Sequence, residues 1–421
     1  MRQIITSVLL AVSFGAAAET IFIDNARVVT VSDAGVLESG DVLVDDGVIA
    51  AVGAELEPPA GAVVVDGAGA WLTPGLFDSS TQIGLGDVES STVRDDHRVD
   101  DSQLGAGFRV SLALDRRSLH IPIVRSEGVT RAIVVPSVGE EIFAGQGATI
   151  ALADDNVIVD ESNAVFVFLG ERSHRVASSR GKAMLELIDA LDEAELLSRN
   201  RRAWESNRLR ELRQSPLDLD ALIPVVDGDK PLVVYVDRAS DIEVLLENTA
   251  DSDVDLIIMG GREAWKVADQ IRARDIPVII NVMDNAPGNF DETGVRLDSA
   301  ALLSAAGVRF ALMTEDLFSD NRTLNQGAGV SVAYGLDWDS AIAAITRVPA
   351  EIWGLGDRYG SIQTGMKADL VLWDGDPLEV TSAPVMMLIR GEAVDLTNRQ
   401  LRLRDRYSTL KNATDQPFGY R

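Results

Sequence analysis

The sequence predicts an α/β fold: a (β/α)8 TIM-type barrel with a small β-sandwich domain built from both chain ends. Apolar strand candidates lie between residues 130 and 314, and helical stretches separate several of them. Short valine-rich runs broken by Asp-Gly lie near both ends of the chain. The length of 421 residues exceeds a single small core and suits a barrel of roughly 250 residues plus a smaller domain.

The N-terminus, MRQIITSVLLAVSFGAAA, has the pattern of a secretory signal peptide over residues 1–18. A basic start is followed by an apolar run and then by a small-residue exit that ends at Ala18. The apolar run is shorter than the roughly 20 residues that span a bilayer, although an uncleaved N-terminal anchor is the alternative. We expect cleavage near Ala18 and a periplasmic or secreted protein without a membrane span.

Both ends of the mature chain predict strands of one domain. IFIDNARVVTV, GDVLVDDGVIAAVG and AVVVDGAGAWLTPG near the start resemble ADLVLWDGDPLE and VMMLIRGEAV near the end. Valine-rich runs of this length with Asp-Gly between them indicate antiparallel hairpins. We assign the chain as a composite β-sandwich domain (19–73 and 367–405), a barrel (74–366) and a C-terminal tail (406–421).

The middle of the chain predicts parallel strands with helices outside them. The strand candidates are residues 130–138, 164–170, 231–237, 255–261, 276–282 and 308–314, and helical stretches cover 181–214 and 261–275. Continuous apolar strands followed by helices favour a closed barrel. An open doubly wound sheet is the alternative, and the sequence lacks the glycine-rich phosphate loop typical of that fold. Residues 136–152 predict a glycine-bearing loop over the barrel mouth.

Composition excludes several classes of function. The formal charge of −28 makes nucleic acid and anionic lipid unsuitable partners. The absence of cysteine removes disulfides, thiolate metal sites and a cysteine nucleophile. The C-terminal stretch from residue 399 is locally basic, and we expect it to dock on an acidic surface of its own fold or of a partner.

Chemistry in such a barrel lies at the carboxyl ends of the strands. The carboxylates expected there include Asp237 and the adjacent pair Glu315 and Asp316, and the pair is the candidate for acid and base catalysis. The alternative for Asp237 is an ion pair with Arg238 or a helix start. Asp78, after the first strand, is expected to cap the loop that follows it.

Two segments carry a resemblance to a known family. WLTPGLFDSSTQIGL, residues 71–85, and the closing stretch AITRVPAEIWGLGDRYGSIQTGMKADLVLWDGDPLE, residues 344–379, resemble the amidohydrolase superfamily, specifically its imidazolonepropionase-like branch. The resemblance covers nearly the whole mature chain. The closing stretch implies the fold and not the catalysis, because its residues are expected to pack the barrel against the sheet.

The resemblance also implies a divalent metal such as zinc, which activates water for hydrolysis of C–N bonds. Carried over to this chain, the ligand pair after the first strand falls on Ser80 and Gln82, and the later histidines fall on Tyr235 and Gly260. The final aspartate position falls on Glu315 or, with a shift of one residue, Asp316. We therefore predict no metal and no cofactor, and expect Ser80, Gln82, Tyr235, Asp237 and His174 to line a binding site at the barrel mouth.

The chain contains three histidines, His97, His120 and His174. His97 has aspartates on both sides and is expected to be solvated, while His120 precedes a helix-like segment and is expected to pack or cap. His174 follows a strand candidate and is the histidine expected at the barrel mouth. A single histidine there is insufficient for a catalytic metal.

Two functional hypotheses follow. The first is an exported member of the superfamily without catalytic metal, a pseudoenzyme that binds a small molecule or serves as a subunit beside a metal-bearing relative, as a homo- or heterodimer. The second is an active C–N hydrolase that uses a displaced metal or a carboxylate acid and base pair. The replaced ligand positions favour the first, and the intact scaffold with Glu315 and Asp316 supports the second.

Overall fold

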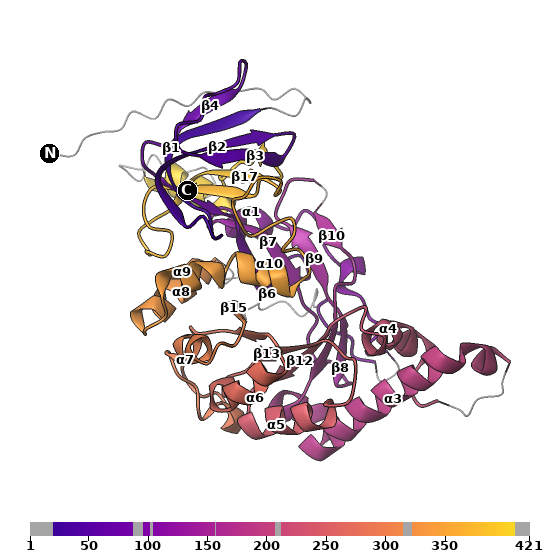
Figure 1. Cartoon of the computed structure of the whole chain (residues 1–421). Coiled ribbons are helices and arrows are strands. Elements are labelled where there is room, and N and C mark those ends of the chain that lie inside the picture. Colours follow the sequence, from indigo (N-terminus) through magenta and orange to yellow (C-terminus); the bar gives the residue numbers. More distant parts are fainter. Residues whose placement is uncertain are drawn as a thin grey trace, which may run out of the picture.

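The computed structural model has an α/β architecture (Figure 1). It describes residues 20–86, 96–101, 104–155, 157–206, 212–314 and 322–408. The proposed signal segment and the acids Glu315 and Asp316 lie outside these ranges. Among the described helices, none combines the length and the apolar composition needed to cross a membrane.

An eight-stranded sheet contains strands from both ends of the chain (Figure 1). Its order is β18-β17-β16-β5-β1-β2-β3, and β4 pairs with β1. The strands are β1 (Ile21–Val29), β2 (Val36–Asp45), β3 (Val48–Gly53), β4 (Val63–Asp66), β5 (Trp71–Pro74), β16 (Leu370–Trp373), β17 (Pro384–Ile389) and β18 (Glu392–Ala393). The antiparallel pairing of β5 with β16 joins the two ends, as their similar sequence texture predicts. A second sandwich layer and the domain boundaries stay predictions.

The β2–β3 hairpin has the tight turn that its Asp-Gly sequence indicates. Asp45 pairs with Val48, so Asp46 and Gly47 form a two-residue loop. Both turn residues have positive φ, 49° for Asp46 and 72° for Gly47. A type I′ turn needs this conformation at both positions, and Asp-Gly is among its preferred sequences.

Two further sheets form the middle of the molecule, with orders β10-β9-β7-β6 and β15-β14-β13-β12-β11-β8. Their strands are β6 (Leu76–Thr81), β7 (Val129–Val134), β8 (Phe143–Gln146), β9 (Ala148–Ala151), β10 (Ile158–Asp160), β11 (Val165–Phe168), β12 (Leu232–Val236), β13 (Leu256–Gly260), β14 (Val278–Ile280) and β15 (Phe310–Leu312). Neighbours from β11 to β15 are parallel, and β6 is parallel to β7. Each apolar run that predicts a strand contains one.

The prediction of a loop at residues 136–152 was wrong in part, because this segment contains the buried strands β8 and β9. Both run antiparallel to their neighbours, β8 to β11 and β9 to β7. A Cβ on Gly145 would lie 2.7 Å from the Phe108 carbonyl oxygen, and one on Gly147 would lie 2.5 Å from the Phe166 ring. These glycines permit close packing of a strand rather than mobility of a loop.

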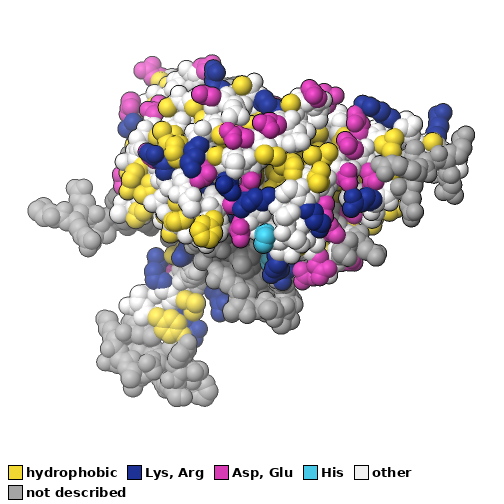
Figure 2. Space-filling model, turned by 90° about the horizontal axis from the view of Figure 1, so that it is seen from below, with side chains coloured by type: hydrophobic (Ala, Val, Ile, Leu, Met, Phe, Trp, Pro, Cys, Tyr) yellow, Lys and Arg dark blue, Asp and Glu magenta, His cyan; other side chains and the backbone are white. Residues whose placement is uncertain are grey.

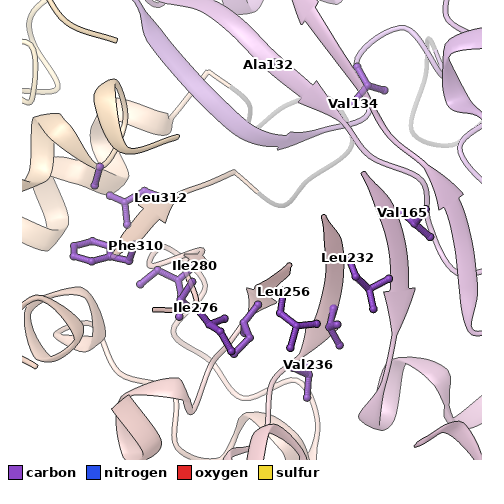
Figure 3. Packing of buried hydrophobic residues seen from close by; sticks show 14 of the residues in the cluster. Ala132, Val134, Val165, Leu232, Val236, Leu256, Ile276, Ile280, Phe310 and Leu312 are labelled. Atoms are coloured by element: carbon purple, nitrogen blue, oxygen red, sulfur yellow. The ribbon is translucent and has the colours of Figure 1, made fainter. Parts of the chain in front are cut away.

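Alternate residues of the central strands belong to two different cores. Side chains such as Leu232, Leu256 and Phe310 face one core, which helices also line (Figure 3). The opposite core receives at least one residue from each of eight strands, among them Phe77, Ile133, Ala144, Phe166, Val233, Ile257, Ile279 and Ala311. Trp353 and Tyr359 join this inner core after helix α10 (Arg347–Ile352). The inner core thus unites strands of both central sheets.

Strands β15 and β6 are edge strands of the two central sheets, and the described residues show no strand pairing between them. The segment before α10 forms hydrogen bonds with both strands at this seam between the sheets. The Leu312 amide donates to the Ala344 carbonyl at 2.9 Å, and the Phe77 amide donates to the Ile345 carbonyl at 2.8 Å. The chain before α10 therefore satisfies the edges of both strands. The sheet pairings alone do not establish a closed barrel.

Helices surround the central strands and connect them (Figure 1). Besides α10, they are α1 (His120–Arg125), α2 (His174–Ala177), α3 (Arg180–Glu205), α4 (Pro216–Val226), α5 (Ala239–Asn248), α6 (Ala268–Ala273), α7 (Ser299–Ala305), α8 (Leu324–Ala333), α9 (Trp338–Ala343) and α11 (Arg399–Ser408). Short 3-10 turns are η1 (Val110–Leu112), η2 (Gly170–Ser173), η3 (Ala264–Val267) and η4 (Phe290–Glu292).

The predicted helix at 181–214 ends at Glu205, and a separate helix, α4, follows. Ser215 caps α4 by accepting a hydrogen bond from the Asp218 amide, and Pro216 occupies the first turn. A serine cap followed by proline is a typical helix start. Helix α11 crosses the boundary predicted between residues 405 and 406.

The closing stretch packs the end sheet against the central strands. Asp369 pairs with Arg131 of β7 at 2.8 Å between Oδ2 and Nε, and both side chains are buried. The Arg131 guanidinium also lies 3.5 Å from the centre of the Tyr359 ring. Gly128, just before β7, permits the close approach of Trp373 in β16, because a Cβ at Gly128 would lie 2.4 Å from the Trp373 ring. The packing role predicted for the closing stretch is confirmed.

Candidate functional site at the strand ends

The end of β6 is tied to the end of β15 by Asp78. This buried carboxylate accepts hydrogen bonds from the Thr314 amide at 3.2 Å and from the Thr314 hydroxyl. It also accepts a hydrogen bond from the Ser80 amide at 3.2 Å, but residues 79–81 continue β6, so the expectation that Asp78 caps a loop after the strand was wrong. Because Asp78 contacts two strand ends, it fixes the spacing between them.

Gln82 connects the end of β6 to the segment after β7. Its Nε2 donates to the Ser137 hydroxyl at 2.6 Å, and the Ser137 amide donates to the carbonyl of His97 at 2.8 Å. His97 is half-buried beside this segment rather than fully solvated, which corrects the sequence expectation. Among the described residues, no group donates to the buried Oε1 atom of Gln82.

Tyr235 lies near the end of β12 and Asp237 directly follows the strand, and Arg172 from η2 contacts both. The Arg172 guanidinium lies 4.2 Å from the centre of the Tyr235 ring, and its Nε lies 3.4 Å from Asp237 Oδ2. Phe168 stacks on the other side of the site, 5.0 Å from Tyr235 between ring centres. The sequence suggested Arg238 as the partner of Asp237, and the contact with Arg172 depends on the tertiary fold.

Gly260, at the end of β13, has no room for a side chain. A Cβ there would lie 2.6 Å from both Asp237 Oδ1 and the Tyr235 ring. Its φ of +88° also belongs to the region that favours glycine. The space in front of β13 is therefore filled by the residues at the end of β12.

A cavity of about 530 Å³ opens beside these residues, at the ends of β14 and β15. Its wall is mixed: Arg172, Asn281, Asp284 and Thr314 are polar, whereas Met283 and Leu312 are apolar. Asp284 is engaged by the buried Arg262 at 3.0 Å. The cavity can therefore receive a small molecule that has both polar and apolar surface.

An ion network fixes the turn that carries Arg172. Arg180 of α3 donates to both carboxylate oxygens of Asp291, at 2.9 and 2.5 Å, and also pairs with Asp241. Burial alone would raise the pKa of Asp291, but the hydrogen bonds from Arg180 and the Glu171 amide hold it below its usual value. For Asp241, burial raises the pKa despite the nearby Arg180. Sequence reasoning missed this network, because its members come from three distant segments.

Comparisons with known proteins agree with this architecture. A family model described as the amidohydrolase family matches residues 266–400. The imidazolonepropionase of Mesorhizobium japonicum is 24% identical over 409 residues, which cover 83% of this chain and 91% of that protein. The crystal structure of an amidohydrolase from Thermotoga maritima has a TM-score of 0.81 at 25% identity, covering 89% of this chain and 99% of that chain. These comparisons support the assignment of the chain to the amidohydrolase superfamily, in its imidazolonepropionase-like branch.

Another relative is much longer. Amidohydrolase tasK of Hapsidospora irregularis is 25% identical over 393 residues, and the match covers 84% of this chain but only 40% of that protein. The chain thus spans less than half the length of this relative. Membership of the amidohydrolase superfamily connects the chain to hydrolases of the C–N type, at the level of the superfamily only.

The described residues to which the sequence resemblance assigns the ligand positions do not fit a divalent metal. A metal of the zinc type needs three or four nitrogen, sulfur or carboxylate ligands. Ser80, Gln82, Tyr235 and Gly260 supply none of these, and the nearby carboxylate of Asp237 is engaged by the Arg172 cation. Within the described ranges, no three His, Asp or Glu side chains converge as a candidate metal site.

The structure brings together some of the predicted site residues. Tyr235 and Asp237 lie together with Arg172, and Ser80 and Gln82 lie at the end of β6. His174 is exposed at the start of α2, while His120 begins α1. The proposed catalytic pair, Glu315 and Asp316, lies outside the described residues. Arg172 was missed, and its position in η2, shortly after β11, was the available signal.

Proposed function

We propose that this chain is an exported member of the amidohydrolase superfamily that holds no catalytic metal and binds a ligand at the strand ends. The ligand is a small molecule or a partner protein such as a metal-bearing relative. The observation that carries the proposal is the arrangement around Gly260, where Tyr235 and Asp237 occupy the space that a side chain would need.

We also propose that the central strands form a closed eight-position barrel whose third position is the bent pair β8 and β9. Support comes from the inner core, which draws at least one residue from each of eight strands. The contacts of Asp78 with Thr314, and of Ala344 and Ile345 with the facing strands, support closure at the seam. In a closed barrel the polar residues at the strand ends face one mouth.

Local electrostatics support binding without a metal. A guanidinium group such as that of Arg172 would repel a divalent cation bound beside Asp237. Without a metal, water activation worth several kcal/mol in the transition state is lost. The cavity beside Arg172 instead offers hydrogen-bonding groups, among them Asn281 and Thr314, to a ligand that carries both donors and acceptors.

Metal content tests the proposal directly. The mature protein would be purified without a histidine tag or chelator from cells supplied with zinc, manganese and iron, and its metal measured by mass spectrometry. We expect well under one equivalent and an unfolding temperature that does not rise when each metal is added. One tightly held equivalent, or hydrolysis of cyclic amides lost in an Asp316→Asn variant, would instead support the active hydrolase. N-terminal sequencing of the mature protein tests export and should begin at residue 19.

A further inference from the structure

Helix α11 (Arg399–Ser408) is basic and has no buried residue. It carries four arginines and one aspartate, and its apolar residue Leu403 is 40% exposed. The helix starts at a fixed point, because Asn398 accepts a hydrogen bond from the Leu401 amide and donates to Ser126 beyond α1. An anchored helix with an exposed apolar residue and positive charge is suited to contact another surface.

A groove of about 560 Å³ has the opposite charge. It lies between α3, the end of α4 and the segment after α5, and buried or half-buried side chains such as Leu187, Leu191 and Val254 contribute to its lining. Its acidic residues are Asp192, Glu195, Asp227, Glu247, Asp251 and Asp253, and Arg199 is the basic residue in its lining. This surface combines apolar area with an excess of carboxylates.

Helix ends add to the negative potential of the groove. Helix α4 ends at Val226 and α5 ends at Asn248, so both carboxyl termini lie at the groove. The carboxyl end of a helix carries about half a negative charge and favours nearby cations. Figure 2, seen from below, shows acidic and basic side chains mixed on the face that it displays. The lining of the groove itself carries six acidic residues and one basic residue.

We propose that α11 of one copy of this chain docks in the acidic groove of a second copy. Its arginines would face the groove carboxylates, and Leu403 would contact the apolar lining. The helix cannot reach the groove of its own chain, because ten residues of helix extend only about 15 Å. Its anchor beyond α1 and the groove along α3 and α5 lie toward opposite ends of the molecule (Figure 1).

Each copy offers one helix and one groove, so a reciprocal exchange closes as a two-fold dimer. Neither element is part of the strand-end cavity, and the proposal therefore does not depend on the state of that site. The contact between charged surfaces should also weaken as salt rises, because exposed charges are screened.

Charge-swapped variants test this dimer by sedimentation velocity. We expect the full chain to be a dimer at 50 mM NaCl and to dissociate at 500 mM. An Arg402→Glu/Arg406→Glu variant and a Glu247→Lys/Asp251→Lys variant should each be monomeric at 50 mM. An equal mixture of the two variants should form a heterodimer. In that pair the acidic helix of the first variant meets the basic groove of the second, and the native helix of the second meets the native groove of the first.

Matched controls separate docking from net charge. Arg116→Glu and Glu57→Lys change exposed residues outside both elements and should leave the dimer intact, and circular dichroism should be unchanged in every variant. A wild-type monomer at low salt, a dimer that survives the helix variant, or a mixture that stays monomeric would each overturn the proposal. The metal measurement is independent of these results.

Discussion

Two regions of the molecule use the same three residue types, an arginine between a tyrosine ring and an aspartate. At the end sheet, Arg131 lies over Tyr359 and pairs with Asp369, and its side chain is 2% exposed. At the strand-end cavity, Arg172 lies over Tyr235 and pairs with Asp237, and its side chain is 31% exposed. The first arginine therefore depends fully on its protein partners, whereas water can solvate the second.

The comparison teaches that burial decides what such a trio does. A buried ion pair costs several kcal/mol when one partner is removed, because the remaining charge is left without solvent or partner. A partly exposed pair contributes about 1 kcal/mol or less. The Arg131 trio accordingly holds two parts of the fold together, while the Arg172 trio leaves a guanidinium at the wall of a cavity.

The largest expected effect is at the buried trio. Arg131→Met should lower the free energy of unfolding in urea by about 3 to 5 kcal/mol, because Asp369 would stay buried without its cation, with the Arg390 amide still donating to it. Adding Asp369→Leu to this variant should recover part of the loss, because no buried charge then remains. A loss below about 1 kcal/mol in the single variant would contradict the structural role of the pair.

The next effect is expected at Gly260. Gly260→Ala should cost about 2 kcal/mol, because its positive φ disfavours a side chain and the new methyl would collide with Tyr235 and Asp237. Gly181→Ala is the control, since no atom lies within 4 Å of that position and it belongs to α3. The control should be neutral or slightly stabilising. Equal losses in both variants would remove the argument from close packing.

A smaller effect is expected at the exposed trio. Arg172→Met should cost about 1 to 2 kcal/mol of unfolding free energy, less than the same change at Arg131, because the lost cation is 31% exposed even though its partner Asp237 is only 5% exposed. Its stronger effect should be on ligand affinity, measured by calorimetry once a ligand has been found by thermal-shift screening. If Arg172→Met destabilised the protein as much as Arg131→Met, the contrast between the two trios would fail.

The smallest effect concerns pH and the network beside Arg172. The lowered pKa of Asp291 means that this residue stabilises the fold above its unfolded pKa of about 3.9, and the contribution is lost as the pH falls through the folded pKa. The difference in unfolding free energy between wild type and Asp291→Asn should therefore shrink between pH 6 and pH 3. A difference that stays constant over this range would contradict the assigned charge state.

Predictability from sequence differed between elements for physical reasons. Apolar runs indicated every strand from β11 to β15, because side-chain pattern is a local property. Strands β8 and β9 were missed, since their glycines indicate a loop until Phe108 and Phe166 are seen to require them. At the candidate site, Tyr235 and Asp237 were found from their position at the end of a strand, but the contribution of Arg172 was not. The predicted pair Glu315 and Asp316 stays a prediction.

The sequence by itself determined the α/β class, the Asp-Gly hairpin of the end sheet and the resemblance that the comparisons support. These features depend on short segments of the sequence, because turn chemistry and residue spacing act locally. Only the tertiary structure decided which charges meet. Arg131 and Asp369 are 238 residues apart, and Asp78 and Thr314 are 236 residues apart. No local pattern specifies such contacts, because the packing of the whole chain selects the partner and sets its burial.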